Sequence, residues 1–122
     1  MLKYFLAAII FVVLDGIYLN LVKGYFNQQI QKIQGSPIQL NIIYTGITYI
    51  FLIFGLIYFI IEKHKSVKDA AVLGFVIYGV YEFTSISLFK NWSLLTVLMD
   101  TTWGTILYAL TTGLVYKIIS IV

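Results

Sequence analysis

Four apolar stretches, each of about 20 residues or more, constrain this chain more than any other feature. They cover residues 2–22, 40–61, 70–89 and 94–118. A helix of about 20 residues crosses the hydrocarbon core of a bilayer. Lipid offers no partner for backbone N–H and C=O groups, so spanning segments must satisfy these groups internally. The stretches lack the polar–apolar alternation of membrane strands. We therefore predict four transmembrane helices.

The composition agrees with a chain whose main solvent is lipid. Hydrophobic residues make up 61% of the 122 residues and charged residues 11%, whereas soluble domains average roughly 45–50% and about 25%. A chain of this length forms one domain, which we expect to be a single transmembrane unit over residues 1–122. The second and third connections are short, and short connections join antiparallel neighbours. The expected fold is all-α, an integral membrane four-helix up-down bundle.

The first connection, KGYFNQQIQKIQGSPIQ, is the longest and the most polar. Phe26, Ile30 and Ile33 recur in it at helical spacing, with glutamines and a lysine between them. This pattern predicts a short amphipathic helix that lies at the membrane interface after the first spanning helix. The sequence Gly35-Ser36-Pro37 is expected to end it. A plain polar loop is the alternative.

The lysines indicate an orientation in the membrane, because cytoplasmic segments carry the larger share of positive charge. On the side of both termini lie Lys3, Lys63, Lys65, Lys68 and Lys117, and on the other side lie Lys23, Lys32 and Lys90. This bias predicts a multi-pass integral membrane protein with both termini in the cytoplasm. The bilayer is the expected partner, and assembly into a homo-oligomer is compatible with the sequence. Nucleic acid is not expected, because the chain has no basic stripe.

Three carboxylates lie inside the apolar stretches, namely Asp15, Glu82 and Asp100. Counted along their helices at 1.5 Å per residue, all three are expected roughly 10 Å below the same membrane surface. Each would cost about 2.5–3.5 kcal/mol at mid-membrane. No lysine lies at that depth, so protonation, hydroxyl donors, water, a cation or a partner chain must compensate them. We interpret the three acids as an ion or proton site.

Further polar side chains are expected near this layer. They are Tyr18, Tyr44, Thr48, Tyr78, Tyr81, Thr84, Ser85, Thr101 and Trp103. Residues three and four apart share a helix face, so four of these groups form inward-facing stripes with the acids, namely Tyr18, Tyr78, Ser85 and Trp103. The chain has no cysteine and no metal-binding or nucleotide-binding motif, so we assign no metal site and identify no cofactor.

The acid-bearing segments LDGIYL, GFVIYGVYEFTSISLFKNWS and DTTWGT resemble a family of predicted four-helix membrane proteins, domain of unknown function 2177. The motif positions are Leu14, Asp15, Tyr18, Tyr81, Glu82, Thr84, Ser85, Asp100, Trp103 and Gly104. Glu82 stands where the family usually has aspartate, and Ser85 stands where it usually has asparagine. The resemblance covers nearly the whole chain. It implies that the three acids belong to one site, and it implies no reaction.

Three functions remain open from the sequence. The leading hypothesis is binding or transport of a cation or proton at the three acids. The second is a membrane-embedded enzyme for a lipid or isoprenoid substrate, in which paired acids serve as general acid and base. The third is a structural or assembly protein, in which the acids hold the helices together. An apolar pocket that opens sideways to lipid would favour the second hypothesis, and a water-filled axial path would favour the first.

Overall fold

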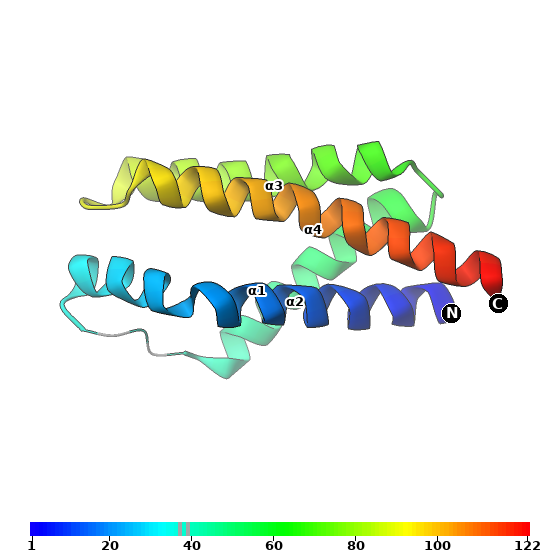
Figure 1. Ribbon diagram of the computed structural model, residues 1–122, viewed down its shortest axis with the longest axis horizontal. Coiled ribbons are helices and arrows are strands. Elements are labelled where there is room, and N and C mark those ends of the chain that lie inside the picture. The colour runs from blue at the N-terminus through cyan, green and yellow to red at the C-terminus, as the bar shows by residue number, and fades with distance from the viewer. Residues whose placement is uncertain (37, 39) are drawn as a thin grey trace.

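The computed structural model describes residues 1–36, 38 and 40–122, and its regular elements are helices (Figure 1). In chain order these are α1 (Leu2–Gln34), α2 (Ile42–Leu56), the π-helical turn η1 (Ile57–Ile61), α3 (Val67–Leu88) and α4 (Leu94–Ile121). With η1 counted as the end of α2, four helices are long and apolar enough to cross a membrane. The predictions of an all-helical chain and of four spans are confirmed.

Side-chain caps explain where three of the helices begin. The side chain of Asn41 accepts a hydrogen bond from Tyr44 N, and that of Ser66 accepts one from Asp69 N. Ser93 Oγ accepts one from Thr96 N at the start of α4. Such caps satisfy backbone donors that have no partner within the helix. The cap at Ser66 is the reason that α3 begins three residues before the apolar stretch expected from residue 70.

A separate interfacial helix after the first span is not confirmed, because α1 runs without a break from Leu2 to Gln34. Gln29, in the part expected to lie on the membrane surface, is buried against the turn between α3 and α4. That contact keeps the last turns of α1 in line with the span. Gly35 ends the helix in the left-handed conformation, with φ 77°. Pro37, part of the expected stop signal, lies outside the described residues.

Helices α3 and α4 form the most closely packed pair, and glycines set their separation. A Cβ atom on Gly74 would overlap the carbonyl oxygen of Gly104, and one on Gly104 would overlap the ring of Tyr78. Small residues allow helix backbones in a membrane to approach this closely. The pair aligns the acids of α3 and α4 side by side along the hairpin.

Helix α2 departs from the expected regular up-down bundle, which is not confirmed. It crosses the other three helices obliquely (Figure 1), and most of its side chains are exposed. Leu56, at its end, is its buried residue. Because α2 is apolar on nearly all sides, lipid solvates it about as well as a neighbouring helix would. The chain termini lie at the same end of the molecule (Figure 1).

The apolar core lies in the half of the bundle that holds the termini. Phe11 from α1 packs edge-on against Tyr108 from α4, with ring centroids 5.4 Å apart. Ile61 and Leu107 complete this fully buried cluster. The oblique path of α2 brings only its C-terminal part into the core. The other half of the bundle contains the polar side chains and a cavity.

Candidate functional site

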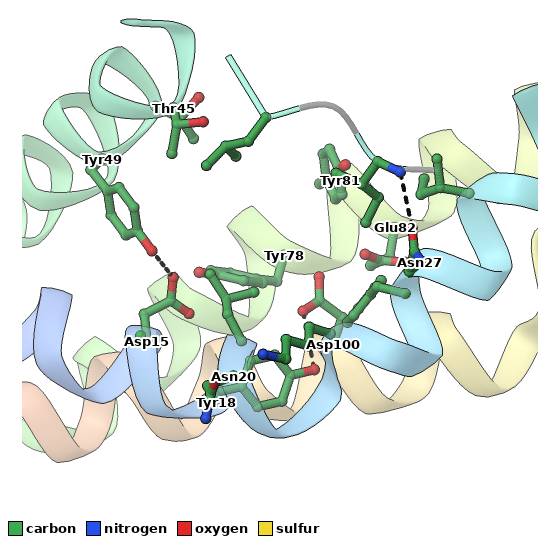
Figure 2. A pocket seen from close by; sticks show the side chains of 18 of the residues that line it. Asp15, Tyr18, Asn20, Asn27, Thr45, Tyr49, Tyr78, Tyr81, Glu82 and Asp100 are labelled. Carbon is green, nitrogen blue, oxygen red and sulfur yellow. Dashed lines mark hydrogen bonds between the residues drawn. The ribbon is translucent and has the colours of Figure 1, made fainter. Parts of the chain in front are cut away.

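A cavity of about 1320 Å³ lies between α1, α2 and α3 in the half away from the termini (Figure 2). Most of its lining side chains come from these three helices, whereas Asp100 comes from α4 and Trp92 from the turn before it. The cavity exists because α2 diverges from the bundle there. All three predicted acids, Asp15, Glu82 and Asp100, line it.

Asp15 is held by two donors from other helices. Tyr49 in α2 donates its hydroxyl to Asp15 Oδ2 at 2.5 Å, and Trp103 Nε1 in α4 donates to Asp15 Oδ1 at 2.9 Å. The Asp15 side chain is buried. These two hydrogen bonds join α1 to α2 and to α4 through one carboxyl group. Each carboxyl oxygen of Asp15 thus accepts a hydrogen bond, as expected of a carboxyl group with a structural role.

Asp100 is linked to Asp15 through two stacked rings. The ring of Tyr18 stacks on Trp103 with centroids 4.6 Å apart and an interplanar angle of 7°. The Tyr18 hydroxyl donates to Asp100 Oδ1 at 3.4 Å. Tyr18 follows Asp15 by three residues, about 4.5 Å along α1, and its side chain carries the contact across to Asp100 on α4.

Glu82 is the most buried acid and the least satisfied. Its side chain has no exposed surface, and its Oε1 accepts a hydrogen bond of 2.9 Å from Trp92 Nε1. Its Oε2 is buried and has no donor among the residues that the structure describes. Asp100 comes from α4, the helix packed against α3, and it lines the same cavity as Glu82. Figure 2 shows both reaching the same part of the pocket.

The three acids therefore divide into a satisfied Asp15 and an acid pair, Glu82–Asp100. Within the described part of the chain, no group of three His, Cys, Asp or Glu side chains is arranged to hold a metal ion. An ion or proton site at the three acids stays a prediction from the sequence.

The supporting polar residues are distributed unevenly. Tyr18, Tyr78, Tyr81 and Thr48 line the cavity, and Trp103 contacts Asp15. The Ser85 hydroxyl is used within α3, where it donates to Tyr81 O. Three predicted residues lie elsewhere: Tyr44 and Thr84 are exposed, and Thr101 lines a second, smaller cavity on another face of the α3–α4 pair.

Two residues that touch the acids were missed from the predicted site. Tyr49 lies four residues after Thr45, and both line the cavity, so their shared helix face was the available signal. Trp92, in the turn between α3 and α4, is 7% exposed and donates to Glu82. Its sequence position beside a turn gave no sign of this inward direction.

A second polar cluster, also missed, joins α1 to the start of α4. The Tyr25 hydroxyl lies 2.8 Å from Ser93 Oγ and 2.7 Å from Thr96 Oγ1. Gln29 Oε1 accepts from Ser93 N at 3.2 Å and from Thr96 Oγ1 at 3.0 Å, and Gln29 Nε2 donates to Asn91 O. These groups satisfy one another, so we assign the cluster a structural role.

Four apolar spans with a carboxylate-lined cavity between them define a polytopic helical membrane protein. The chain belongs to the family described as predicted membrane protein, DUF2177, whose family model matches residues 1–117. The resemblance read from the acid motifs is thereby confirmed. No curated protein and no solved structure matches the chain.

Proposed function

We propose that the protein binds a small amphiphilic molecule within the membrane, with a hydrogen-bond-donating group of that molecule at the Glu82–Asp100 pair. The observation that carries the proposal is a buried carboxyl oxygen without a donor, Glu82 Oε2, on the wall of a large cavity. Two carboxyl groups that face each other out of water repel unless a proton, a cation or a donor lies between them. A ligand that supplies hydrogen-bond donors would satisfy Glu82 Oε2 and would also reduce the repulsion between the two carboxyl groups.

The cavity supports a ligand of lipid or isoprenoid class. Its volume of about 1320 Å³ exceeds the roughly 300–1,000 Å³ of ordinary ligand pockets. Leu19, Phe26, Leu52 and Ile77 contribute aliphatic and aromatic wall. In a bilayer, the side of the cavity beside the loosely packed α2 adjoins lipid, so a molecule dissolved in the membrane can enter sideways. The acid pair could then also act as general acid and base on that molecule.

Passage of protons or cations is the second candidate, favoured by the presence of Glu82 and Asp100 at the same cavity (Figure 2). A conduction path would have to continue through the other half of the bundle. There Phe11, Leu107 and Tyr108 are fully buried and packed together. Closely packed apolar side chains exclude water, so this candidate requires that half to open. The lysine bias continues to favour cytoplasmic termini under either candidate.

Ligand retention tests the proposal. The wild-type protein, Glu82→Gln and the control Glu62→Gln are purified from membranes in mild detergent, and bound molecules are identified by native mass spectrometry. Glu62 lies outside the cavity and is exposed. We expect the wild type and Glu62→Gln to retain the same apolar molecule and Glu82→Gln to lose most of it. Equal occupancy in Glu82→Gln and wild type would contradict the proposal.

Flux measurements in liposomes test the second candidate. Protons and monovalent cations are followed for the wild type and for the triple variant Asp15→Asn/Glu82→Gln/Asp100→Asn. Flux by the wild type and none by a folded triple variant would establish transport. Ligand retention with no flux in either protein would establish binding alone.

A further inference from the structure

We infer that the bound amphiphile is a lipid with an anionic head group and that Lys23 holds this head group at the rim of the cavity. The inference rests on the proposed function and names the ligand class of the same site. It is carried by polar residues of α1 that line the cavity but play no part in the acid network. These are Asn20, Lys23 and Asn27, at positions separated by three and four residues.

Lys23 is free to bind an anion. It is exposed and lines the cavity. In the part of the chain that the structure describes, no carboxylate lies within ion-pairing distance of it. Asp15, the acid on the same helix, precedes it by eight residues, or about 12 Å. Asn27 Oδ1 accepts from Ile38 N at 2.9 Å, so its amide NH₂ remains as a second donor at the rim.

The depth of Lys23 is that of a lipid head group. Lys23 follows Lys3, at the other end of α1, by twenty residues, which is about 30 Å of helix and equals the thickness of the hydrocarbon core. The two lysines therefore bracket the core, with Lys23 at one interface. A soluble anion would contact the same ammonium group, but it could not use the apolar wall that leads inward past Leu19.

Charge fixes the direction of the lipid. An anionic head group is attracted to Lys23 and repelled by the buried acids, so it stays at the rim while the apolar chain passes inward. The acid pair, about one third of the membrane deeper, is then left to an uncharged donor farther along the same molecule, such as a hydroxyl group.

Brominated lipids test the inference, because bromine in the acyl chain quenches tryptophan and the chain has only Trp92 and Trp103. Trp92 lines the cavity, and Trp103 contacts Asp15 in its wall. The protein is placed in phosphatidylcholine vesicles, and brominated phosphatidylglycerol or brominated phosphatidylcholine is added at increasing mole fraction. The variants are Lys23→Gln, the conservative Lys23→Arg and the control Lys32→Gln. Lys32 is on the same helix and outside the cavity lining.

We expect saturable quenching in the wild type at about fivefold lower mole fraction for the anionic lipid, the preference that one lysine gives near a membrane surface. Lys23→Gln should remove the preference, whereas Lys23→Arg and Lys32→Gln should keep it. Soluble glycerol phosphate should not displace the lipid, and displacement would point to a free anion instead. Equal quenching by both lipids in the wild type, or a preference that survives in Lys23→Gln, would overturn the inference while leaving the cavity as a lipid site. An absence of saturable quenching by either lipid would also overturn the inference, whereas the proposed function is decided by the ligand-retention measurement with Glu82→Gln.

Discussion

At the residue scale, the Glu82 carboxyl group depends on one donor, Trp92 Nε1, which lies 2.9 Å from Oε1. Asp15, in contrast, has two donors from two helices. A buried acceptor that loses its partner pays the desolvation cost in full, about 1–3 kcal/mol. Glu82 is therefore the less satisfied of these two acids, and its unpaired oxygen is the one that the proposed ligand would satisfy.

Replacing Trp92 with Phe should therefore lower the stability of the ligand-free protein by about 1–3 kcal/mol. The loss should be smaller when Glu82 is already Leu, because no carboxyl oxygen then needs the donor. Equilibrium unfolding in detergent of Trp92→Phe, Glu82→Leu and the double variant measures this coupling. Additive losses would show that the hydrogen bond contributes nothing beyond packing.

The sequence located the acids but not all of their partners. Asp15, Glu82 and Asp100 stand out because charge inside an apolar stretch is costly, whatever the tertiary structure. Trp92 could not be placed in the same way, because a tryptophan beside a turn satisfies the expectation of an interfacial belt equally well. Thr101 was expected at the acids, but its position on α4 turns it toward a different cavity.

At the element scale, the close crossing of α3 and α4 holds Glu82 beside Asp100. A methyl group at Gly74 would overlap the backbone of Gly104 and lie 2.9 Å from Tyr108 Cβ. At Gly79, on the same helix, the nearest atom to such a methyl group is 3.9 Å away. The two glycines thus differ only in what faces them.

Gly74→Ala should destabilise the protein by about 1–3 kcal/mol, because the helices must separate to admit the new atom. Gly79→Ala should be neutral or stabilising by up to about 1 kcal/mol, because alanine is the better helix former. Thermal unfolding of both variants in the same detergent checks this contrast. Equal behaviour of the two would mean that the crossing is not as close as described.

The last turns of α1 are the element that sequence periodicity misassigned. Phe26, Ile30 and Ile33 do recur at helical spacing, but periodicity does not say whether a helix lies on the membrane or continues a span. Gln29 decides the matter, because its side chain bonds the start of α4 and the preceding turn. A hydrogen bond between segments more than 60 residues apart leaves no local signal in the sequence.

Replacing Gln29 with Ala should loosen these turns. The variant loses the bonds to Asn91, Ser93 and Thr96, so amide hydrogens of residues 26–34 should exchange faster by about tenfold or more, the factor for a loss of 1.4 kcal/mol. Gln28→Ala is the matched control, because Gln28 is exposed. Hydrogen exchange followed by mass spectrometry makes the comparison. Identical exchange in both variants would show that the hydrogen bonds of Gln29 do not stabilise the last turns of α1.

At the scale of the whole molecule, the oblique path of α2 divides the bundle into a packed half and a hollow half. Hydropathy predicts that α2 crosses the membrane, and the four spans are present. Its angle could not be predicted, because most side chains of α2 are apolar, and its few polar residues mark a face without fixing how the helix packs. The cavity and its lining from three helices follow from that angle, so neither was visible in the sequence.

The central claim is that an amphiphile, rather than bulk water, meets the Glu82 carboxyl group. Solid-state NMR of the protein in bilayers, with ¹³C in the glutamate carboxyl groups, tests it directly. The chain has two glutamates, and exposed Glu62 serves as an internal reference for contact with water. We predict magnetisation transfer to the Glu82 carboxyl carbon from protons of a bound apolar molecule, and to that of Glu62 from water. Transfer from water alone at both glutamates would contradict the account and favour an open ionic path.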